Sequence, residues 1–276
     1  MGIGLSARAG WRAAYASVIG TAHLRTGAPC QDAGRCTVLR ASDGCEALVA
    51  AASDGAGTAA RSEIGAALAV EAFIAEFGAA ARDDPTLARI DRAFVSSWIA
   101  RFQDVIAARA SAEGCTPSDF ACTLLGAVVT ATNAVYVQIG DGAIIVGTEE
   151  PDHYAWVAWP QHGEYANATN FVTEARAAAV AEFEKGPAID EIALFTDGIE
   201  RLVLDSAHRS VHAPAFRPIF AWLRATDPGC PAAPSEALTA YLGSAHVNAR
   251  TDDDKTLVMA TRRSAAPHGA QDGSGA

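Results

Sequence analysis

The sequence predicts an α+β fold, a four-layer α-β-β-α sandwich in which two antiparallel sheets are flanked by helix pairs. Three features of the 276-residue chain predict it. Short segments typical of strands occur near both ends and in the middle of the chain. Two pairs of segments with helical character stand between and after these strands. Packing the helix pairs on the outer faces of two stacked sheets would bury every apolar stripe.

The first half of the chain is expected to contain strands followed by two helices. Short apolar or β-branched segments, expected as strands, stand at residues 11–20, 35–40 and 45–53. After Gly57, apolar residues recur in steps of three and four, which predicts an amphipathic helix over about 58–81. A second stripe of this kind predicts a helix over about 87–111.

The second half begins with a run of closely spaced strands. We expect four of them from Ala121 onwards, in "CTLLGAVVTAT", "AVYVQIGD", "GAIIVGT" and "YAWVAW". Because turns such as "TN" and "DG" are so short, the strands that they join should pair antiparallel. Residues 160–187 are polar and are expected to leave the sheet. A strand at "EIALFTD", helices at 214–226 and 234–246, and a last strand at "KTLVMATR" complete the prediction.

The composition indicates one globular domain over residues 1–264 and a disordered tail, rich in Gly, Ala and Ser, over 265–276. A net charge of −11, from 21 basic and 32 acidic residues, argues against nucleic acid or an anionic membrane as a partner. No apolar run approaches the length of about 18 residues that predicts a membrane span. The six cysteines form no CxxC pair and no zinc spacing, which favours reduced thiols in a cytoplasmic protein.

Acidic residues follow predicted strands repeatedly. Asp54 stands in "SDGAG", Asp141 in "IGDGAIIV" and Asp197 in "LFTDGIE", each directly before a glycine. Any single Asp-Gly pair fits an ordinary turn. The chain also has three consecutive carboxylates in "TDDDKTLVMA", which must be either solvated or neutralised by a cation. Because carboxylates are hard oxygen ligands and little His or thiolate is nearby, the sequence favours Mg²⁺ or Mn²⁺.

An ordered series of motifs resembles one known family. They are "GTAHLRTGAPCQDAG" (20–34), "SDGAG" (53–57), "DFACTLLGAVV" (119–129), "IGDGAIIV" (139–146), "GEYANATNF" (163–171), "LFTDGIE" (194–200) and "DDKTLVMA" (253–260). Their order and content resemble the PP2C-type metal-dependent protein serine/threonine phosphatases, in particular the bacterial branch. The family's fold, two antiparallel sheets flanked by helix pairs, agrees with the layout predicted from the residues.

The resemblance implies a ligand set for two metal ions, Mn²⁺ or Mg²⁺. Asp54 would bridge the two ions, and the carbonyl group of Gly55 would join one of them. Asp197 and Asp253 would bind the second ion. Asp119, together with Asp197, would hold a third and weaker ion.

Further residues take supporting roles by the same resemblance. Asp32 would orient a water molecule held by the metals, so that we count it with Asp54, Asp197 and Asp253 as a catalytic residue. Asp254 stands where the family often has Asn, and Asp141 belongs to a motif of structural importance and is not expected to be a ligand.

The chain departs from the family pattern at two places. Many eukaryotic members have a histidine after Asp-Gly that is proposed to protonate the leaving group, whereas this chain has Ala56. The family commonly grips phosphate with an arginine near the N-terminus, and here the substrate-binding candidates are His23 and Arg25. Asn167 and Asn170 lie in the segment that corresponds to the family's variable flap.

The resemblance implies a protein phosphatase that hydrolyses phosphoserine and phosphothreonine with a water activated by two metal ions. Two alternatives remain open: a non-catalytic module of the same fold that binds phosphoproteins, and a two-metal hydrolase of small phosphorylated metabolites. The expected partners are a phosphorylated protein substrate and a cognate serine/threonine kinase, and the chain is expected to be a monomer.

Overall fold

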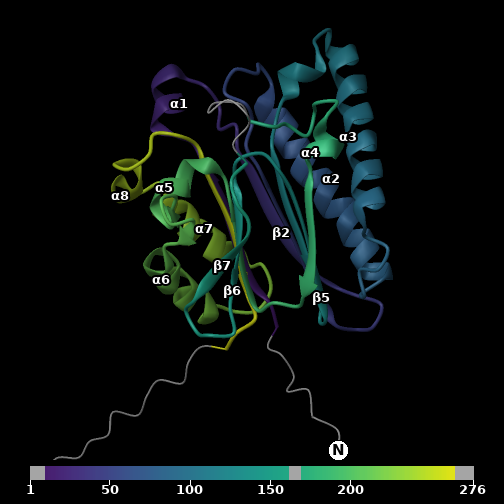
Figure 1. Ribbon diagram of the computed structural model, residues 1–276. Helices are drawn as coiled ribbons and strands as arrows, with labels where there is room; N and C mark the ends of the chain where they lie inside the picture. Colours follow the sequence, from purple (N-terminus) through teal and green to yellow (C-terminus); the bar gives the residue numbers. More distant parts are fainter. Residues whose placement is uncertain (1–9, 162–168, 265–276) are drawn as a thin grey trace, which may run out of the picture.

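The computed structural model describes residues 10–161 and 169–264, and these residues form four layers (Figure 1). Two stacked sheets lie in the middle. The outer face of one sheet is covered by two long helices, α2 (Ser62–Asp83) and α3 (Arg92–Glu113). The other sheet is covered by α6 (Ala213–Arg224) and α7 (Ala232–Leu242). The α+β sandwich predicted from the sequence is confirmed.

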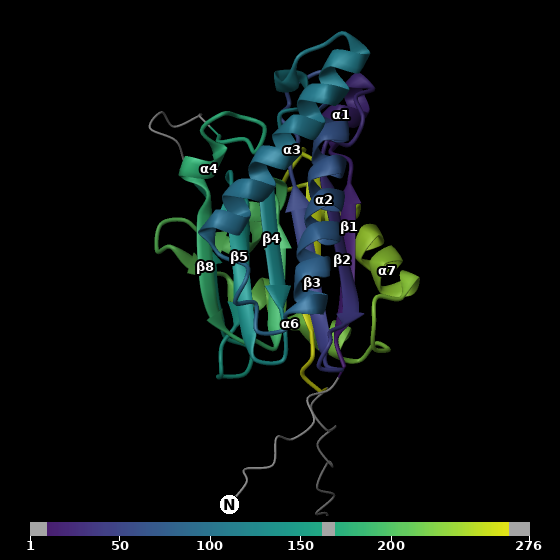
Figure 2. The ribbon, with the colours of Figure 1, turned by 90° about the vertical axis from the view of Figure 1, so that its right-hand side faces the viewer.

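The sheet beneath α2 and α3 is five-stranded, and each neighbouring pair of strands is antiparallel. Figure 2 shows the two helices lying across its outer face. Its strands, in spatial order, are β2 (Ala33–Arg40), β3 (Glu46–Ser53), β4 (Leu124–Val129), β5 (Asn133–Ile139) and β8 (Glu182–Pro187).

The second five-stranded sheet contains both the first and the last strand of the described chain, and these two strands are neighbours. Its neighbouring strands are again antiparallel. In spatial order they are β1 (Arg12–Val18), β12 (Lys255–Thr261), β9 (Glu191–Phe195), β6 (Ala143–Gly147) and β7 (Tyr154–Ala158).

Short elements connect the layers. The helical ones are α1 (Thr21–Thr26), η1 (Pro117–Phe120), α4 (Ala177–Val180), η2 (Asp197–Ile199), α5 (Glu200–Val203) and α8 (Ala245–Asn248). A small hairpin is formed by β10 (Leu204–Asp205) and β11 (Ser210–Val211). Neither α1 nor this hairpin was expected from the sequence, since both are too short to show a period.

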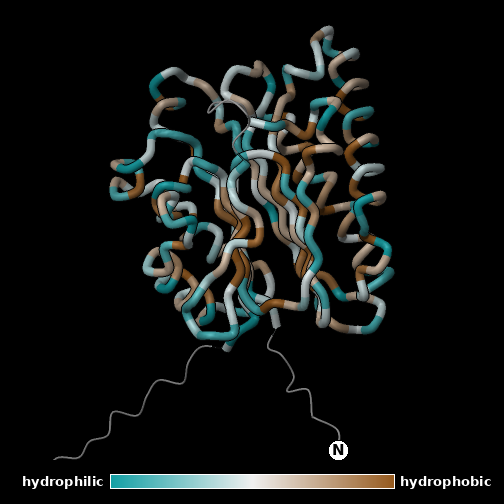
Figure 3. Tube along the Cα trace, viewed as in Figure 1, coloured by the Kyte–Doolittle hydropathy of each residue, from teal (hydrophilic) through white to brown (hydrophobic). Residues whose placement is uncertain are grey.

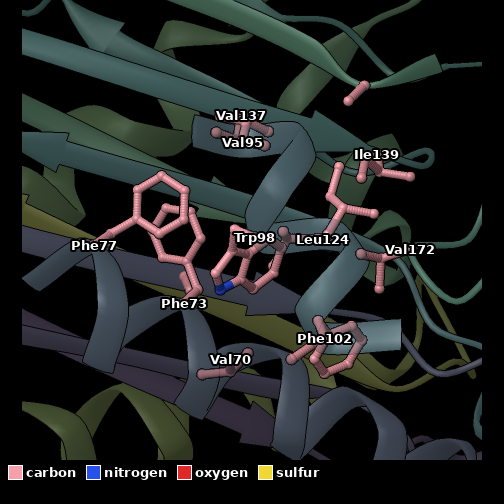
Figure 4. Packing of buried hydrophobic residues seen from close by; sticks show 14 of the residues in the cluster. Val70, Phe73, Phe77, Val95, Trp98, Phe102, Leu124, Val137, Ile139 and Val172 are labelled. Carbon is pink, nitrogen blue, oxygen red and sulfur yellow. The ribbon is translucent and has the colours of Figure 1, made fainter. Parts of the chain in front are cut away.

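The apolar core occupies the space between the sheets and the space under each helix pair. Apolar segments gather along the strands in the middle of the molecule (Figure 3). Under α2 and α3, Phe73 stacks on Phe77 with ring centroids 3.9 Å apart, and Trp98 of α3 meets both rings edge-on (Figure 4). Such offset and edge-to-face contacts add to the free energy of burying the rings.

Helix α2 is long and apolar enough to span a membrane, judged by length and composition alone. The sequence analysis predicted no membrane span, because no uninterrupted apolar run is that long. It is a core helix of the sandwich. Its apolar residues, among them Val70, Phe73 and Phe77, are buried in the cluster that packs on the adjoining sheet. Three of its exposed positions are also apolar, Ala67, Ala75 and Ala79, which adds to the low polarity of the helix.

The expectation that the "DG" turn joins paired strands is wrong at Asp141-Gly142. Strand β5 pairs with β4 and β8, whereas β6 pairs with β7 and β9 in the other sheet. The turn is therefore a crossover between the sheets. Gly140 has a φ of 114° at this point, a backbone conformation that residues other than glycine rarely adopt. The buried Gln138 side chain holds the crossover by donating to the carbonyl groups of Gly140 and Gly142.

Residues 160–187 were expected to leave the sheet, and this prediction is wrong for the end of the segment. Their last six residues form β8, which pairs with β5 along its length. This strand lies at the edge of the sheet and most of its residues are charged, glycine or proline, so it lacks an apolar period. Asn167 and the predicted tail at 265–276 lie outside the described residues.

Helix boundaries also differ from the prediction. The helix expected from residue 58 begins at Ser62, because residues 55–61 turn sharply after β3. The helix expected over 234–246 is divided at Gly243 into α7 and α8. At the second of these boundaries the Gly243 N–H still donates to the carbonyl group of Thr239, and α8 starts anew with Ser244 as its N-cap, whose side chain accepts from the Val247 N–H.

Replacing Gly126 with Ala is expected to lower the free energy of unfolding by about 1–3 kcal/mol, as overpacking typically does. Gly126 lies in β4, and a Cβ atom there would come within 2.2 Å of the Phe73 ring, which is itself wedged against Phe77 and Trp98. The matched control is Gly186→Ala in β8, where a Cβ atom meets nothing within 4 Å. Urea unfolding of both variants measures the difference, and equal stabilities would contradict this packing.

Candidate metal centre

Strand registers bring the predicted acids to one end of the sandwich. The start of β2 faces the end of β3, with Ala33 opposite Ser53. In the other sheet Phe195, the last residue of β9, lies opposite both Ala143 of β6 and Leu257 of β12. Each of these strand ends borders an aspartate: Asp32, Asp54, Asp197, Asp141, and the pair Asp253 and Asp254. Antiparallel pairing therefore gathers acids that are far apart in sequence.

Asp54 is fixed by backbone contacts where β3 ends. Its N–H donates to Thr123 Oγ1, and its carbonyl group accepts from the Thr123 N–H, both at 2.8 Å. The neighbouring Gly55 N–H donates to the carbonyl group of Gln31 at 3.1 Å. Burial raises the pKa of Asp54 well above its usual value, and the charges of Asp32 and Asp197 raise it further.

Asp32 is a buried acid that links the two sheets. Its Oδ2 accepts a hydrogen bond from Thr196 Oγ1 at 2.7 Å, and Thr196 belongs to the turn after β9. Burial raises the pKa of Asp32 to about 7, although the bond from Thr196 opposes this effect. Thr196 itself is held by Thr256, whose N–H donates to the same hydroxyl group at 3.0 Å.

Asp197 stands at the start of η2 and is partly buried. Burial raises its pKa to about 7, and the charges of Asp141 and Asp253 raise it further, while a hydrogen bond with Asp54 acts in the opposite direction. Asp54, Asp197, Asp141 and Asp253 therefore repel one another at this end of the molecule.

Asp141 belongs to this group, although the resemblance implied a structural role for it and not that of a ligand. Its Oδ2 accepts from Thr169 Oγ1 at 2.6 Å, whereas its buried Oδ1 has no hydrogen-bond partner among the described residues. Its charge raises the pKa of both Asp54 and Asp197. The crossover at Gly140–Gly142 places it there, and a "DG" pair has the same local sequence in a crossover as in a hairpin turn.

Asp253 and Asp254 face different surroundings although they are adjacent. Asp253 is exposed and contributes charge to the cluster, whereas only 3% of the Asp254 surface is exposed. Asp254 accepts from the N–H groups of Gly20 and Gln31, both at 2.6 Å, and contacts His23 Nδ1 at 2.9 Å. It thus ties the segment around α1 to the start of β12 and orients the His23 ring.

A buried lysine lies under the acids. Lys255 is fully buried, and its Nζ donates to the carbonyl group of Asp253 at 3.0 Å. Burial lowers its pKa, and the charges of Asp254 and Asp253 oppose that shift. In the sequence this residue looked like the charged start of a strand, and nothing in its spacing indicated burial.

Asp119 and Arg25 make their side-chain contacts with residues outside the cluster. The Asp119 carboxylate accepts from Thr116 N and Thr116 Oγ1, both at 2.8 Å, in the capping box of η1. These bonds lower the pKa of Asp119, as expected for an acid that serves as an acceptor. Arg25 is exposed at the surface of α1 and pairs with Asp252 at 3.0 Å.

The position after Asp54-Gly55 carries no acid or base. Ala56 is held by its backbone, since its N–H donates to the carbonyl group of Ala121 at 2.9 Å. A proton donor for a leaving group cannot come from this side chain. The nearest candidate from the sequence, His23, lies beside Asp254 at the other sheet.

The cluster fits a divalent cation in its chemistry. Within residues 10–161 and 169–264, no three His, Cys, Asp or Glu side chains stand at the spacing of a ready-made metal site. However, the acids are all hard oxygen donors, the charged forms of Asp54 and Asp197 are disfavoured by burial and by nearby acids, and the buried Asp141 Oδ1 has no partner among the described residues. Bound positive charge would relieve all three effects.

The architecture is that of bacterial serine/threonine phosphatases. Stp1 of Staphylococcus aureus superimposes with a TM-score of 0.59 at 14% identity, covering 95% of this chain and 98% of that one. The Mycobacterium tuberculosis phosphatase PstP/Ppp superimposes with a TM-score of 0.56 at 15% identity, covering 91% and 98%. At these identities the likeness establishes the fold.

Sequence comparison establishes the family. The family model for protein phosphatase 2C matches residues 19–243. The chain is also 34% identical over 255 residues to serine/threonine-protein phosphatase 3 of Escherichia coli K12, which covers 91% of this chain and 98% of the relative. The chain therefore belongs to the protein phosphatase 2C family. This confirms the resemblance and the expectation of an enzyme of the serine/threonine phosphatase class.

Replacing Asp54 with Asn is expected to stabilise the protein when EDTA keeps it free of metal. Because the pKa of Asp54 is raised in the folded state, stability present below its unfolded pKa of about 4 is lost as pH rises through the folded value. The variant avoids this loss at neutral pH. About 1 kcal/mol corresponds to about 2–4 °C in a domain of this size, so a thermal midpoint a few degrees higher is expected.

The comparison is made by thermal unfolding across acidic to neutral pH. The advantage of Asp54→Asn should shrink as the pH falls, because the wild-type carboxyl group then becomes protonated. Asp43→Asn, in the exposed turn between β2 and β3, is the matched control and should change little. A variant that is less stable than the wild type at neutral pH would show that Asp54 is not held under repulsion.

Proposed function

We propose that the chain is a Mn²⁺- or Mg²⁺-dependent protein phosphatase that hydrolyses phosphoserine and phosphothreonine with a water activated by two metal ions. The observation that supports this most strongly is the convergence of Asp32, Asp54, Asp197 and Asp253 from both sheets. The enzyme would act in the cytoplasm as a monomer, on proteins phosphorylated by a cognate serine/threonine kinase.

Each acid has a part that follows from its position. Asp54 would hold both ions, the carbonyl group of Gly55 would join one of them, and Asp197 and Asp253 would hold the second ion. Bound ions of this kind lower the pKa of a water molecule and neutralise phosphoryl oxygens. Asp32, held by Thr196 at 2.7 Å, would orient the attacking water and accept a hydrogen bond from it.

Asp119 would hold a third and weaker ion together with Asp197. Its carboxylate is occupied by two bonds from Thr116, so binding there must compete with the capping box of η1. This competition accounts for a weak site, because the ion gains a ligand only as the turn loses its cap.

His23 would bind the phosphate group of the substrate. Asp254 contacts Nδ1 and is itself fixed by two backbone N–H groups, so the ring is oriented and Nε2 is left for a substrate oxygen. Arg25, exposed on the same helix α1 and paired with Asp252, would be the second substrate-binding residue.

Activity on a phosphothreonine peptide is expected to require added Mn²⁺ or Mg²⁺ and to disappear in EDTA. Asp253→Asn should lose nearly all of it, because a neutral amide is a poorer ligand for a hard cation. Asp252→Asn is the matched control from the same run of acids, since its exposed side chain pairs with Arg25 instead. Phosphate release measured with both variants makes the comparison.

The outcomes separate the proposal from its alternatives. Metal binding with no turnover of any phosphoester would favour a module that only binds phosphoproteins. Turnover of small phosphorylated metabolites but not of phosphopeptides would favour a metabolite hydrolase. Full activity in EDTA, or in Asp253→Asn, would contradict the assignment of the metal centre.

Replacing His23 with Ala is expected to raise KM for a phosphopeptide and for p-nitrophenyl phosphate alike, because both contain the phosphate group that the ring would bind. His208→Ala is the matched control: His208 makes a similar contact with Asp205, at 2.7 Å, in the exposed β10–β11 turn. If kcat falls by about 10² or more for the peptide only, His23 is instead the proton donor that Ala56 cannot be.

A further inference from the structure

Two cysteines that are 194 residues apart in sequence meet at the edge of the sandwich. The Sγ atoms of Cys36 and Cys230 are 3.9 Å apart. Cys36 lies in β2, and only 5% of its surface is exposed. Cys230 is exposed and lies in the segment between α6 and α7. One thiol is therefore accessible to a dissolved reagent while its neighbour is protected.

Backbone hydrogen bonds hold both cysteines in place. Cys36 pairs with Ala50 in the centre of the β2–β3 ladder. The segment of Cys230 is attached to β1, because the Gly229 N–H donates to the carbonyl group of Trp11 at 2.6 Å and the Ala13 N–H donates to that of Gly229 at 2.8 Å. The contact between the two sulfur atoms thus follows from the strand pairing of both sheets.

The two thiols also differ in pKa. The hydrogen bond from Cys36 lowers the pKa of the Cys230 thiol, and a backbone hydrogen bond from Val38 acts in the same direction. The same contact, together with burial, raises the pKa of Cys36. Cys230 is therefore the better nucleophile of the two, since the thiolate is the reactive form.

We propose that Cys230 is an oxidation site for hydroperoxides and that Cys36 is the thiol that converts the oxidised residue into a disulfide. The exposed sulfur would react first, and the buried sulfur 3.9 Å away would react with the product. The bond would join β2, the edge of one sheet, to the segment that borders β1, the edge of the other.

The chemistry balances with a hydroperoxide as the oxidant. The Cys230 thiolate attacks the peroxide, the O–O bond breaks, and the residue becomes a sulfenic acid while water or an alcohol leaves with a proton from solvent. Cys36 then attacks the Cys230 sulfur, the S–O bond breaks, and hydroxide departs as water with the Cys36 proton. Two thiols are oxidised and one peroxide is reduced.

The step needs only a small movement. A disulfide has an S–S distance of about 2.05 Å, so the two sulfur atoms must approach by roughly 2 Å from their separation of 3.9 Å. Cys230 is exposed and lies in the connection between α6 and α7, so its side chain is the one that has room to move.

The test treats the purified full chain with one equivalent of hydrogen peroxide, blocks remaining thiols and digests with trypsin. Peptide 36–40 is expected to be joined to peptide 225–250, and the joined species should disappear on reduction with dithiothreitol. Cys45→Ser, which changes another exposed cysteine, is the matched control and should leave the cross-link intact. Cys230→Ser should abolish it.

A second variant separates the two roles. In Cys36→Ala, which keeps a small apolar residue in the buried site, the sulfenic acid should persist on Cys230 and be trapped there by dimedone. Thermal unfolding checks that the variants are folded. The proposal is overturned if peroxide reacts at Cys45 in preference to Cys230, if no joined peptide forms in the wild type, or if Cys36→Ala yields no adduct on Cys230. These readouts do not depend on phosphatase activity.

Discussion

The central constraint on this structure is that the fold holds several aspartates close together although their negative charges repel one another. Antiparallel pairing within each sheet brings aspartates from five strand ends to one edge, and the stacking of the sheets places Asp32 and Asp54 opposite Asp197. The raised pKa values of Asp32, Asp54 and Asp197 express the cost of charging buried acids close together. The apolar sandwich and its aromatic clusters supply the stability that offsets this cost. A site that favours bound cations is the direct consequence.

The fold and most of the acids could be predicted from the sequence because both depend on local patterns. Strand and helix periods are visible without tertiary information, and Asp-Gly after an apolar run marks a strand end wherever the strand lies. The crossover at Asp141 could not be predicted, since "DG" has the same local form whether it joins partners in one sheet or links two sheets. Strand β8 was missed because an edge strand need not bury alternate residues.

The contacts that support the site could not be predicted from the sequence either, because they join residues that are far apart in the chain. Lys255 looks like any charged residue before a strand, and only the packed structure shows that it is buried beneath Asp253 and Asp254. Asp119 is the opposite case: its sequence motif predicts a metal ligand, whereas in the structure its carboxylate takes part in the capping box of η1. Asp254 contacts the His23 ring, and this contact depends on how α1 meets the start of β12.

Calorimetric titration of the EDTA-treated protein with Mn²⁺ tests the central claim most directly. If the gathered acids form the metal centre, the wild type should bind two ions tightly, a third more weakly, and Asp54→Asn should lose the tight sites because the residue shared by both ions is gone. Asp119→Ala should lose only the weak site. Tight binding that persists unchanged in Asp54→Asn, or no binding by the wild type, would contradict the account.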